Sequence, residues 1–511
     1  MKRRDFIKSS LALSILGTQI PLMALGKTQQ TIRRRTGTWD SDRILVLIKM
    51  DGGNDGLNSV IPVYDSLYHQ ARPTLAFDEN EALMVTEDSG FHPQMAPFVP
   101  IFQNGEMGII HGVGYPQSNL SHFRSSDIWV TGSPANEIWS SGWLGRLFNN
   151  EYPNFPNGAP EHPIAIQFGS ANLLEFQSEQ TNFATMLFDP EIMYAIVNEN
   201  YVPGSNDPPP ETYGGDELNF VRELDLTTLE YSEEIYNAGQ NGNLTVEYPN
   251  NNLGDQLAVT AKLISGGLTT PVYRLHIRGF DNHAGQDNAH PQRLNQMSTA
   301  ISAFLQDLKN QGLDDRVLTV TTSEFGRRVE ENGSSGTDHG TSGPIFTFGS
   351  TTIGDVFGSQ PSLSNLDNNG NLLAEHDFRQ VYSTLIEDWF GLDPSISQFV
   401  FQDTFDPIPF VSDPLSVTGS PAVPEAFALF PAFPNPFNPA TNIRFELPIA
   451  AKTSVRIFDI KGREVRTHQL GKLNVGKHDF VLDGRDLSSG VYHIQVETAG
   501  SVQSQRVTLL K

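Results

Sequence analysis

Residues 44–58 have the sequence ILVLIKMDGGNDGLN, and this segment sets the architecture of the chain. It begins with an apolar, β-branched run from Ile44 to Lys49, reaches Asp51, and then turns on Gly52 and Gly53. A short apolar run predicts a buried strand, and the paired glycines predict a sharp turn after it. Asp51 is therefore expected at the carboxyl end of a strand.

Three more short apolar runs follow along the chain, at residues 108–112, 272–278 and 317–322. Between the last two, apolar residues recur at helical spacing up to Gly312, where a helix would stop. These residues are Leu294, Met297, Ile301, Phe304, Leu305 and Leu308. Strand, helix and strand in succession predict an α/β fold with a mainly parallel sheet flanked by helices.

A composition shift near residue 417 predicts a second domain. Residues 416–424 are rich in Ser, Pro and Gly, and short alternating strands with glycine turns follow them, a pattern typical of a small C-terminal β-sandwich. The expected organisation is a signal peptide at 1–26, linkers at 27–41 and 417–428, an α/β domain at 42–416 and a β-sandwich at 429–511.

The overall charge argues against a nucleic-acid partner. Lys and Arg total 34 against 59 Asp and Glu, a formal net charge of -25. A surface this acidic repels phosphate backbones. Because the chain contains 0 Cys, thiolate metal sites and cysteine nucleophiles are excluded, and any metal ligands must be nitrogen or oxygen donors.

The first residues indicate export. Arg3 and Arg4 precede Phe6, and a mildly apolar stretch runs from Leu11 to Leu25. This pattern is typical of a twin-arginine signal, with a general secretory signal or a retained anchor as the alternatives. We expect the twin-arginine translocase as a partner and a location in the periplasm, at the cell surface or outside the cell.

Acids and histidines gather where the predicted strands end, which predicts a divalent metal site of zinc, manganese, calcium or magnesium. For each loop taken alone, a plain turn without a ligand is the alternative. The candidate ligands are Asp51, Asp281, His283, Glu324, Asp338 and His339.

The loop after residues 108–112 is expected to supply a nucleophile. Ser121 stands near the start of a predicted helix, where free N–H groups favour an anion, although a serine there could simply cap the helix. Ser118 and Ser125 compete with it. Arg124 is a candidate for holding the transferring group, and Arg327 for binding an anionic substrate, unless Arg327 is part of an ion-paired surface.

Several motifs together resemble the domain-of-unknown-function 1501 family. They are VLIKMDGGNDGLNSVIPVYDSLY, SHFRSSDIWVTG, SGWLGRLFN, GFDNH, SEFGR, TDHGT and DFRQVYSTLIEDWFGL. That family is similar to the alkaline phosphatase and sulfatase superfamily, which implies an α/β fold with two metals at the strand ends beside a Ser or Thr nucleophile.

The resemblance implies that Asp51 binds metal and that Asp281 and His283 belong to one metal site. Glu324 stands where the superfamily has Asp-His, and Phe325 replaces that histidine, which puts a second metal in doubt. At the C-terminus, the motifs NPFNP, IFDIKGREV and LSSGVYHIQV resemble the sorting domains of type IX secretion, which implies the outer-membrane secretion machinery as a partner.

The resulting hypothesis is an exported metal-dependent hydrolase of small phosphate or sulfate esters. The alternative is a non-catalytic cell-surface protein that retains the fold, with a structural ion or with glycan binding. Three tryptophans could stack on sugars in that case: Trp129, Trp139 and Trp143.

Overall fold

The computed structural model describes residues 42–156, 159–169, 173–179, 181–187, 231–412, 427–429, 432, 435, 437–473, 476–498 and 500–511. The expected signal peptide and first linker lie outside these residues, as does nearly all of the second linker. The chain divides into two compact units, the first ending at Ser412 and the second beginning at Asp413.

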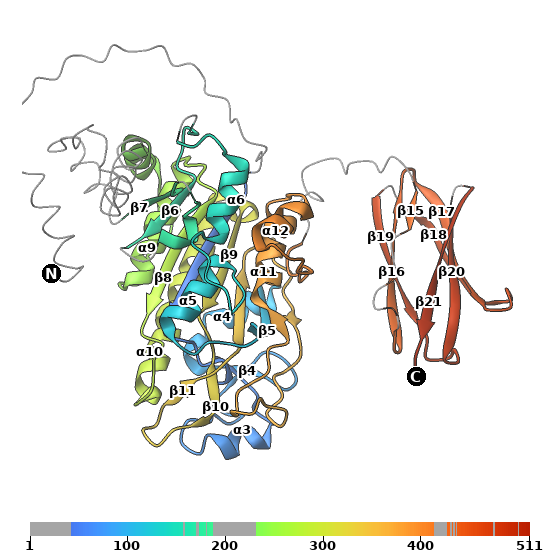
Figure 1. Cartoon of the computed structure of the whole chain (residues 1–511), viewed down its shortest axis with the longest axis horizontal. Helices are drawn as coiled ribbons and strands as arrows, with labels where there is room; N and C mark the ends of the chain where they lie inside the picture. Colours follow the sequence, from blue (N-terminus) through green and yellow to red (C-terminus); the bar gives the residue numbers. More distant parts are fainter. Residues whose placement is uncertain are drawn as a thin grey trace, which may run out of the picture. The chain divides into compact units, whose positions relative to one another are not determined.

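The first unit is built on a nine-stranded mixed sheet (Figure 1). β1 pairs in parallel with β8 on one side and β9 on the other, while β12 runs antiparallel between β9 and β5. In spatial order the strands are β13 (Val356–Phe357), β5 (Met107–Gly114), β12 (Gly343–Phe348), β9 (Val317–Ser323), β1 (Ile44–Asp51), β8 (Val272–Arg278), β6 (Ala165–Phe168) and β7 (Ala184–Leu187), with β14 (His376–Asp377) also on β5.

Helices cover both faces of this sheet, as Figure 1 shows. On one face, Val46, Ile48 and Met50 of β1 pack in a core with α4, α9 and α10. On the other, Leu45 and Leu47 pack with α5, α6, α11 and α12. A strand buried on both faces needs a nearly continuous apolar sequence, which is what residues 44–48 supply. The helices are α4 (Phe98–Gln103), α5 (His122–Thr131), α6 (Trp143–Glu151), α9 (Asn252–Ser265), α10 (Gln286–Gln311), α11 (Phe378–Thr384) and α12 (Pro394–Phe401).

Short elements complete the unit, several of them around the carboxyl ends of the central strands. The small helices are α2 (Gly56–Ser59), α3 (Ser66–Ala71), the 3₁₀ turns η1 (Pro93–Met95), η2 (Leu173–Phe176) and η4 (Asp314–Arg316), and the π-helical η5 (Leu385–Trp389). The small sheets are β2 (Val60–Ile61), β4 (Gly90–Phe91) and β3 (Leu83–Met84), and the pair β10 (Arg327–Glu331) and β11 (Thr337–His339).

The second unit consists of two antiparallel sheets around a core of its own. One sheet is β15 (Ala428–Leu429), β16 (Ala440–Leu447) and β19 (Gly476–Asp483); the other is β18 (Glu464–Leu473), β17 (Ala451–Asp459), β20 (Gly490–Thr498) and β21 (Ser501–Leu509). The predicted fold class, a helix-flanked and mainly parallel sheet followed by a small β-sandwich, is confirmed.

Local predictions agree closely with the elements. The helix expected to end at Gly312 is α10, and Gly312 closes it in the left-handed conformation, with φ of 64°. Trp129 and Trp143 lie in the core, so these two rings are not available to stack on sugars. Within the described part of the chain, no helix is long and apolar enough to cross a membrane.

Candidate metal centre

The parallel pairing of β8, β1 and β9 places their carboxyl ends side by side. Asp51 is in register with Arg278, and Met50 with Ser323. Asp281 lies in the loop just after β8, and Glu324 directly follows β9. Because the side chains that follow parallel strands meet at one edge of the sheet, residues far apart in sequence come together here.

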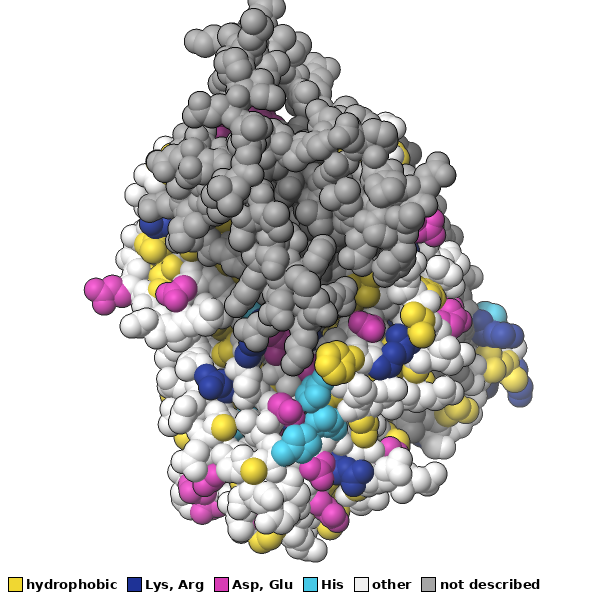
Figure 2. All heavy atoms as spheres, turned by 60° about the vertical axis from the view of Figure 1, so that its left-hand side comes forward, with side chains coloured by type: hydrophobic (Ala, Val, Ile, Leu, Met, Phe, Trp, Pro, Cys, Tyr) yellow, Lys and Arg dark blue, Asp and Glu magenta, His cyan; other side chains and the backbone are white. Residues whose placement is uncertain are grey.

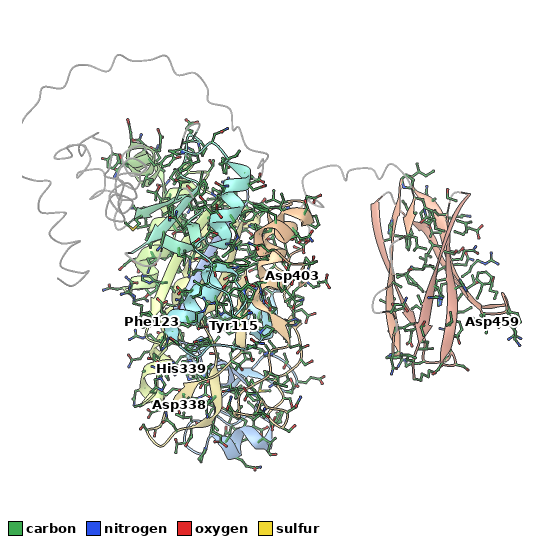
Figure 3. All side chains as sticks on the ribbon, in the orientation of Figure 1. Tyr115, Phe123, Asp338, His339, Asp403 and Asp459 are labelled. Atoms are coloured by element: carbon green, nitrogen blue, oxygen red, sulfur yellow. The ribbon has the colours of Figure 1, made fainter. Side chains whose placement is uncertain are left out.

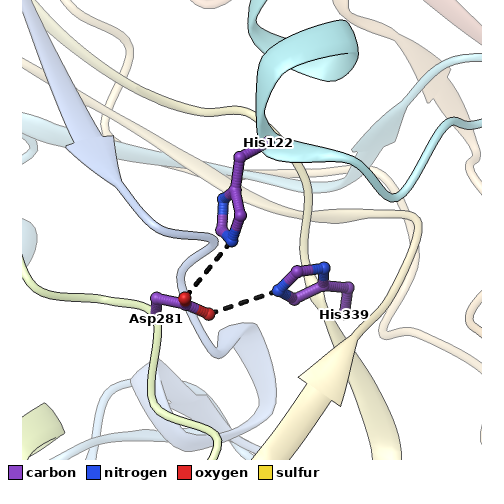
Figure 4. Close-up of side chains that lie close together, drawn as sticks. All are labelled: His122, Asp281 and His339. Carbon is purple, nitrogen blue, oxygen red and sulfur yellow. Dashed lines mark hydrogen bonds and ion pairs between the residues drawn. The ribbon is translucent and has the colours of Figure 1, made fainter.

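Two further segments reach this edge. α5 begins at His122, and β11 ends at His339. Figure 4 shows the two imidazoles converging on the carboxylate of Asp281. His122 Nε2 lies 3.3 Å from Asp281 Oδ2, and His339 Nε2 lies 3.2 Å from Oδ1. One ligand atom from each of these three residues lies within 4.8 Å of the others, a group that could hold a metal ion.

His283 lies beside this group and brings a third imidazole close to Asp281. Its Nε2 lies 3.1 Å from Asp281 Oδ1 and 2.9 Å from His339 Nε2. We call His122, Asp281, His283 and His339 the centre. Three ring nitrogens and one carboxylate are a donor set suited to zinc, manganese or another divalent ion.

Each imidazole of the centre is held by its other nitrogen. Nδ1 of His122 lies 3.0 Å from Glu324 Oε1, and Nδ1 of His283 lies 3.0 Å from Asp338 Oδ1. Nδ1 of His339 lies 2.7 Å from the carbonyl oxygen of Leu120. These oxygens only accept hydrogen bonds, so the Nδ1 atoms donate, and the Nε2 atom of each ring faces the other members of the centre.

The arrangement of these side chains favours a bound cation. Nε2 of His283 and Nε2 of His339 lie 2.9 Å apart and both face a carboxylate, so a proton or a metal ion must lie between them to prevent repulsion of their lone pairs. Metal-bound histidines commonly donate the second ring N–H to a carboxylate or carbonyl, which fixes the ring. The centre has this pattern at all three histidines.

The charges of the centre are set by its neighbours. Burial raises the pKa of Asp281, but hydrogen bonds from Arg327 and His339 outweigh it, and the pKa falls to about 2. The hydrogen bond to Glu324 raises the pKa of His122, whereas burial lowers the pKa of His339. The carboxylate is thus ionised at neutral pH, as a metal ligand must be.

The centre is open to solvent on one side. The side chains of Asp281 and His283 are each 46 % exposed, and that of His122 is 34 % exposed. Figure 2 shows histidine side chains gathered on one face, with acidic side chains beside them. On the inner side, the ring of Phe325 packs against His339 with centroids 4.4 Å apart and against His122 at 4.9 Å. A metal ion at the centre would face the Phe325 ring on its inner side and solvent on its outer side, which leaves room for an external ligand.

The other three predicted ligands have different positions. Glu324 and Asp338 orient His122 and His283 from behind, and neither is among the converging groups. Asp51 lies at the same edge but pairs with Lys49 and His276. In Figure 3, Asp338 and His339 are labelled on β11, with Phe123 at the start of α5.

His122 was missed by sequence reasoning, which examined its segment only for a nucleophile. A signal was present, since an imidazole stands at the start of the helix that follows a strand. Tyr115 fixes this segment: its hydroxyl accepts from the N–H of Asn119 at 3.0 Å and bonds with Ser125 Oγ at 2.8 Å.

The two candidate arginines have different surroundings. Arg327 is 2 % exposed, and its guanidinium donates to Gly53, Thr337 and Asp281 at 2.7–2.8 Å, as well as to the carbonyls of Gly52 and Phe280. With its donors used inside the chain, Arg327 positions Asp281 and is not free to bind a substrate. Arg124 donates to carbonyls of the loop at residues 134–137.

The three candidate serines differ in accessibility. Ser125 is fully buried and donates to the carbonyl of Glu324. Ser118 donates to the Tyr115 carbonyl at 2.7 Å. Ser121 is exposed at the N-cap of α5, and its side chain makes no capping bond. Of its two neighbours in sequence, Leu120 accepts a hydrogen bond from His339, and His122 is itself a member of the centre.

Two protein-family models match parts of the chain. Residues 232–393 match the family described as "Protein of unknown function (DUF1501)", and residues 431–509 match the "Secretion system C-terminal sorting domain". Both predicted resemblances are confirmed by these matches. The second match marks the protein as exported, at the cell surface or secreted, and points to the secretion machinery as a partner.

Solved structures give more distant likenesses. PorZ, a surface component of the type-IX secretion system of Porphyromonas gingivalis, is 20% identical over 16% of this chain and only 12% of its own, with a TM-score of 0.13. A protein of the alkaline phosphatase superfamily from Vibrio parahaemolyticus is 9% identical over 85% of this chain and 83% of its own, with a TM-score of 0.33. The sulfatase PsFucS1 from Pseudoalteromonas sp. is 12% identical over 86% and 83%, with a TM-score of 0.30. No curated protein matches the chain.

Proposed function

We propose that this protein is an exported, metal-dependent hydrolase of small phosphate or sulfate esters. The observation that carries the proposal is the convergence of three Nε2 atoms on the Asp281 carboxylate, with every Nδ1 held by an acceptor. A divalent ion held by these four side chains would supply Lewis-acid stabilisation of the negative charge that develops in ester hydrolysis. Zinc and manganese suit this donor set best.

Ser121 is the proposed nucleophile. It is exposed, its hydroxyl is not used in capping, and it stands at the start of α5, where first-turn N–H groups have no partner within the helix. Attack of Oγ on phosphorus or sulfur would expel the alcohol and leave an ester on Ser121, which water would then hydrolyse. The N–H groups and the helix dipole would stabilise the anion bound there.

The proposal favours an open catalytic site over an enclosed structural ion. A structural site is normally closed by four protein ligands and shielded, whereas Asp281 and His283 are each 46 % exposed. For the route of export, the proposal combines the twin-arginine translocase at the inner membrane with the type IX machinery at the outer membrane.

The test is metal content together with ester hydrolysis. The wild-type protein is expected to carry about one equivalent of zinc or manganese and to hydrolyse an aryl phosphate or aryl sulfate. Asp281→Ala and His122→Ala should lose the ion and the activity together, while Ser121→Ala should keep the ion and lose the activity. His493→Ala, which removes an exposed imidazole from the second unit, is the control. Full metal content and full turnover in Asp281→Ala would show that the assignment is wrong.

A further inference from the structure

A second polar cluster lies at the same edge of the sheet, beside the centre. Lys49 Nζ is 3.0 Å from Asp51 Oδ1, and His276 Nδ1 is 3.3 Å from Asp51 Oδ2. Lys49 Nζ also donates to Ser126 Oγ at 2.9 Å. We call these four residues the lysine cluster.

The strands explain why the cluster forms. Lys49 and Asp51 are two residues apart on β1, so both side chains point to the same face of the sheet. His276 of β8 is in direct register with Lys49. Ser126 comes from α5, four residues after His122, so one face of this helix contacts both the lysine cluster and the centre.

Both oxygens of Asp51 are used within the lysine cluster. One carries the ammonium of Lys49 and the other accepts from the imidazole of His276. Burial would raise the pKa of Asp51, but the hydrogen bond from His276 and the positive charge of Lys49 lower it strongly. The carboxylate is ionised and its charge is balanced by a cation that belongs to the chain.

A divalent ion on Asp51 would have to displace that cation. The side chains of Lys49, Asp51 and His276 are only 18 %, 28 % and 13 % exposed, so solvent would screen the repulsion between an ammonium and a divalent ion weakly. Without the ammonium, a carboxylate, an imidazole and a hydroxyl would face one space, which is a donor set for a divalent ion.

We propose that the protein binds a single divalent ion at the centre, and that the Lys49 ammonium fills the place beside Asp51 that a second ion would take. The proposal rests on the ion of the proposed function and adds its number. Lys49 is then the residue that sets the metal count, and it keeps one positive charge fixed next to the centre whatever ions surround the exported protein.

In the experiment, metal-free protein is titrated with zinc and with manganese, and the titration is followed by calorimetry. The bound metal is then measured by elemental analysis after gel filtration. Wild type should bind about one equivalent, and Lys49→Met, which keeps the length of the side chain and removes the charge, should bind about two. The double variant Lys49→Met with Asp51→Asn should return to one. Lys309→Met removes an ammonium from an exposed ion pair with Glu106 and should behave as wild type.

Asp51→Asn alone keeps the test decisive if Lys49→Met does not fold. Asp51 is not a ligand in the proposal, so this variant should bind one equivalent with the affinity of wild type. Loss of the ion in Asp51→Asn, or one equivalent in folded Lys49→Met, overturns the proposal. Two equivalents in wild type overturn the metal count alone, whereas no ion in wild type overturns the proposed function as well.

Discussion

Glu324 shows how a single buried side chain fixes the centre without belonging to it. Its carboxylate is 3 % exposed, and Oε1 lies 2.8 Å from the N–H of Gly52 and 3.0 Å from His122 Nδ1. Its Oε2 is buried with no hydrogen-bond partner. The residue therefore joins the turn after β1 to the first imidazole of α5.

Replacing Glu324 by Gln is expected to weaken metal binding by about 10- to 100-fold, because the support of a metal-bound histidine is lost. The amide would either meet the Nδ1–H of His122 donor to donor or leave its NH₂ buried without an acceptor. Calorimetric titration of the metal-free variant measures the change. Asp338→Asn, at the exposed carboxylate behind His283, is the matched comparison and should lose less. An unchanged affinity in Glu324→Gln would contradict the assigned role of this side chain.

At the scale of elements, the turn after β1 and the loop after β8 touch through backbone atoms. Gly52 has φ of +123°, and a Cβ placed on it would lie 2.3 Å from the backbone nitrogen of Asp281. Only glycine allows both the conformation and the close approach. The position of Asp281 thus depends on a residue without a side chain in the neighbouring strand's turn.

Gly52→Ala is expected to reduce the free energy of unfolding by more than backbone strain alone would, which is about 1–3 kcal/mol. It should also weaken metal binding by displacing Asp281. Gly267→Ala is the control, because Gly267 has φ of +95° with nothing within 4 Å of the added atom, and so it carries only the strain. Urea unfolding and metal titration of both variants measure the difference. If the two alanines had equal effects on both quantities, close contact at Gly52 would not matter.

For the whole first unit, buried histidines make the free energy of unfolding depend on pH in the acidic range. Burial lowers the pKa of His92 and of His111 to about 4, and that of His290 to about 3. The unfolded chain takes up these protons near the ordinary value of 6.5, before the folded protein does. Stability is therefore complete above that value and is lost as the pH falls toward 4.

In metal-free protein, the free energy of unfolding should fall with a slope of at most about 4 kcal/mol per pH unit, since each of three protons contributes about 1.4. His122, whose pKa is raised, acts in the opposite sense but is one group against three. Urea unfolding between pH 7 and pH 5 measures the slope. His290→Gln should reduce it by about one proton's share, and equal stability at the two pH values would contradict the expectation.

The features that the sequence determined by itself are those that depend on interactions between residues close together along the chain. Apolar runs and glycine stops depend on near neighbours, so β1, β8, β9 and the end of α10 were predictable to within a residue or two, and so was the gathering of acids and histidines at strand ends. The start of α10, at Gln286, was not, because the apolar spacing begins only at Leu294. The motifs also determined the sorting domain.

Only the tertiary structure decided which groups meet. His122 reaches Asp281 because the segment after β5 is fixed by Tyr115. The imidazole at the start of a helix was visible in the sequence, but not the group that it contacts. Arg327 resembles a surface arginine in the sequence, yet in the structure it is buried and donates hydrogen bonds to backbone carbonyls of the turn after β1. Asp51 stands at a strand end like a ligand, but strand alternation and the register with β8 give it to Lys49 and His276. The physical reason is that a carboxylate, imidazole or guanidinium acquires its role from the partners within about 3 Å, and those partners come from distant parts of the chain.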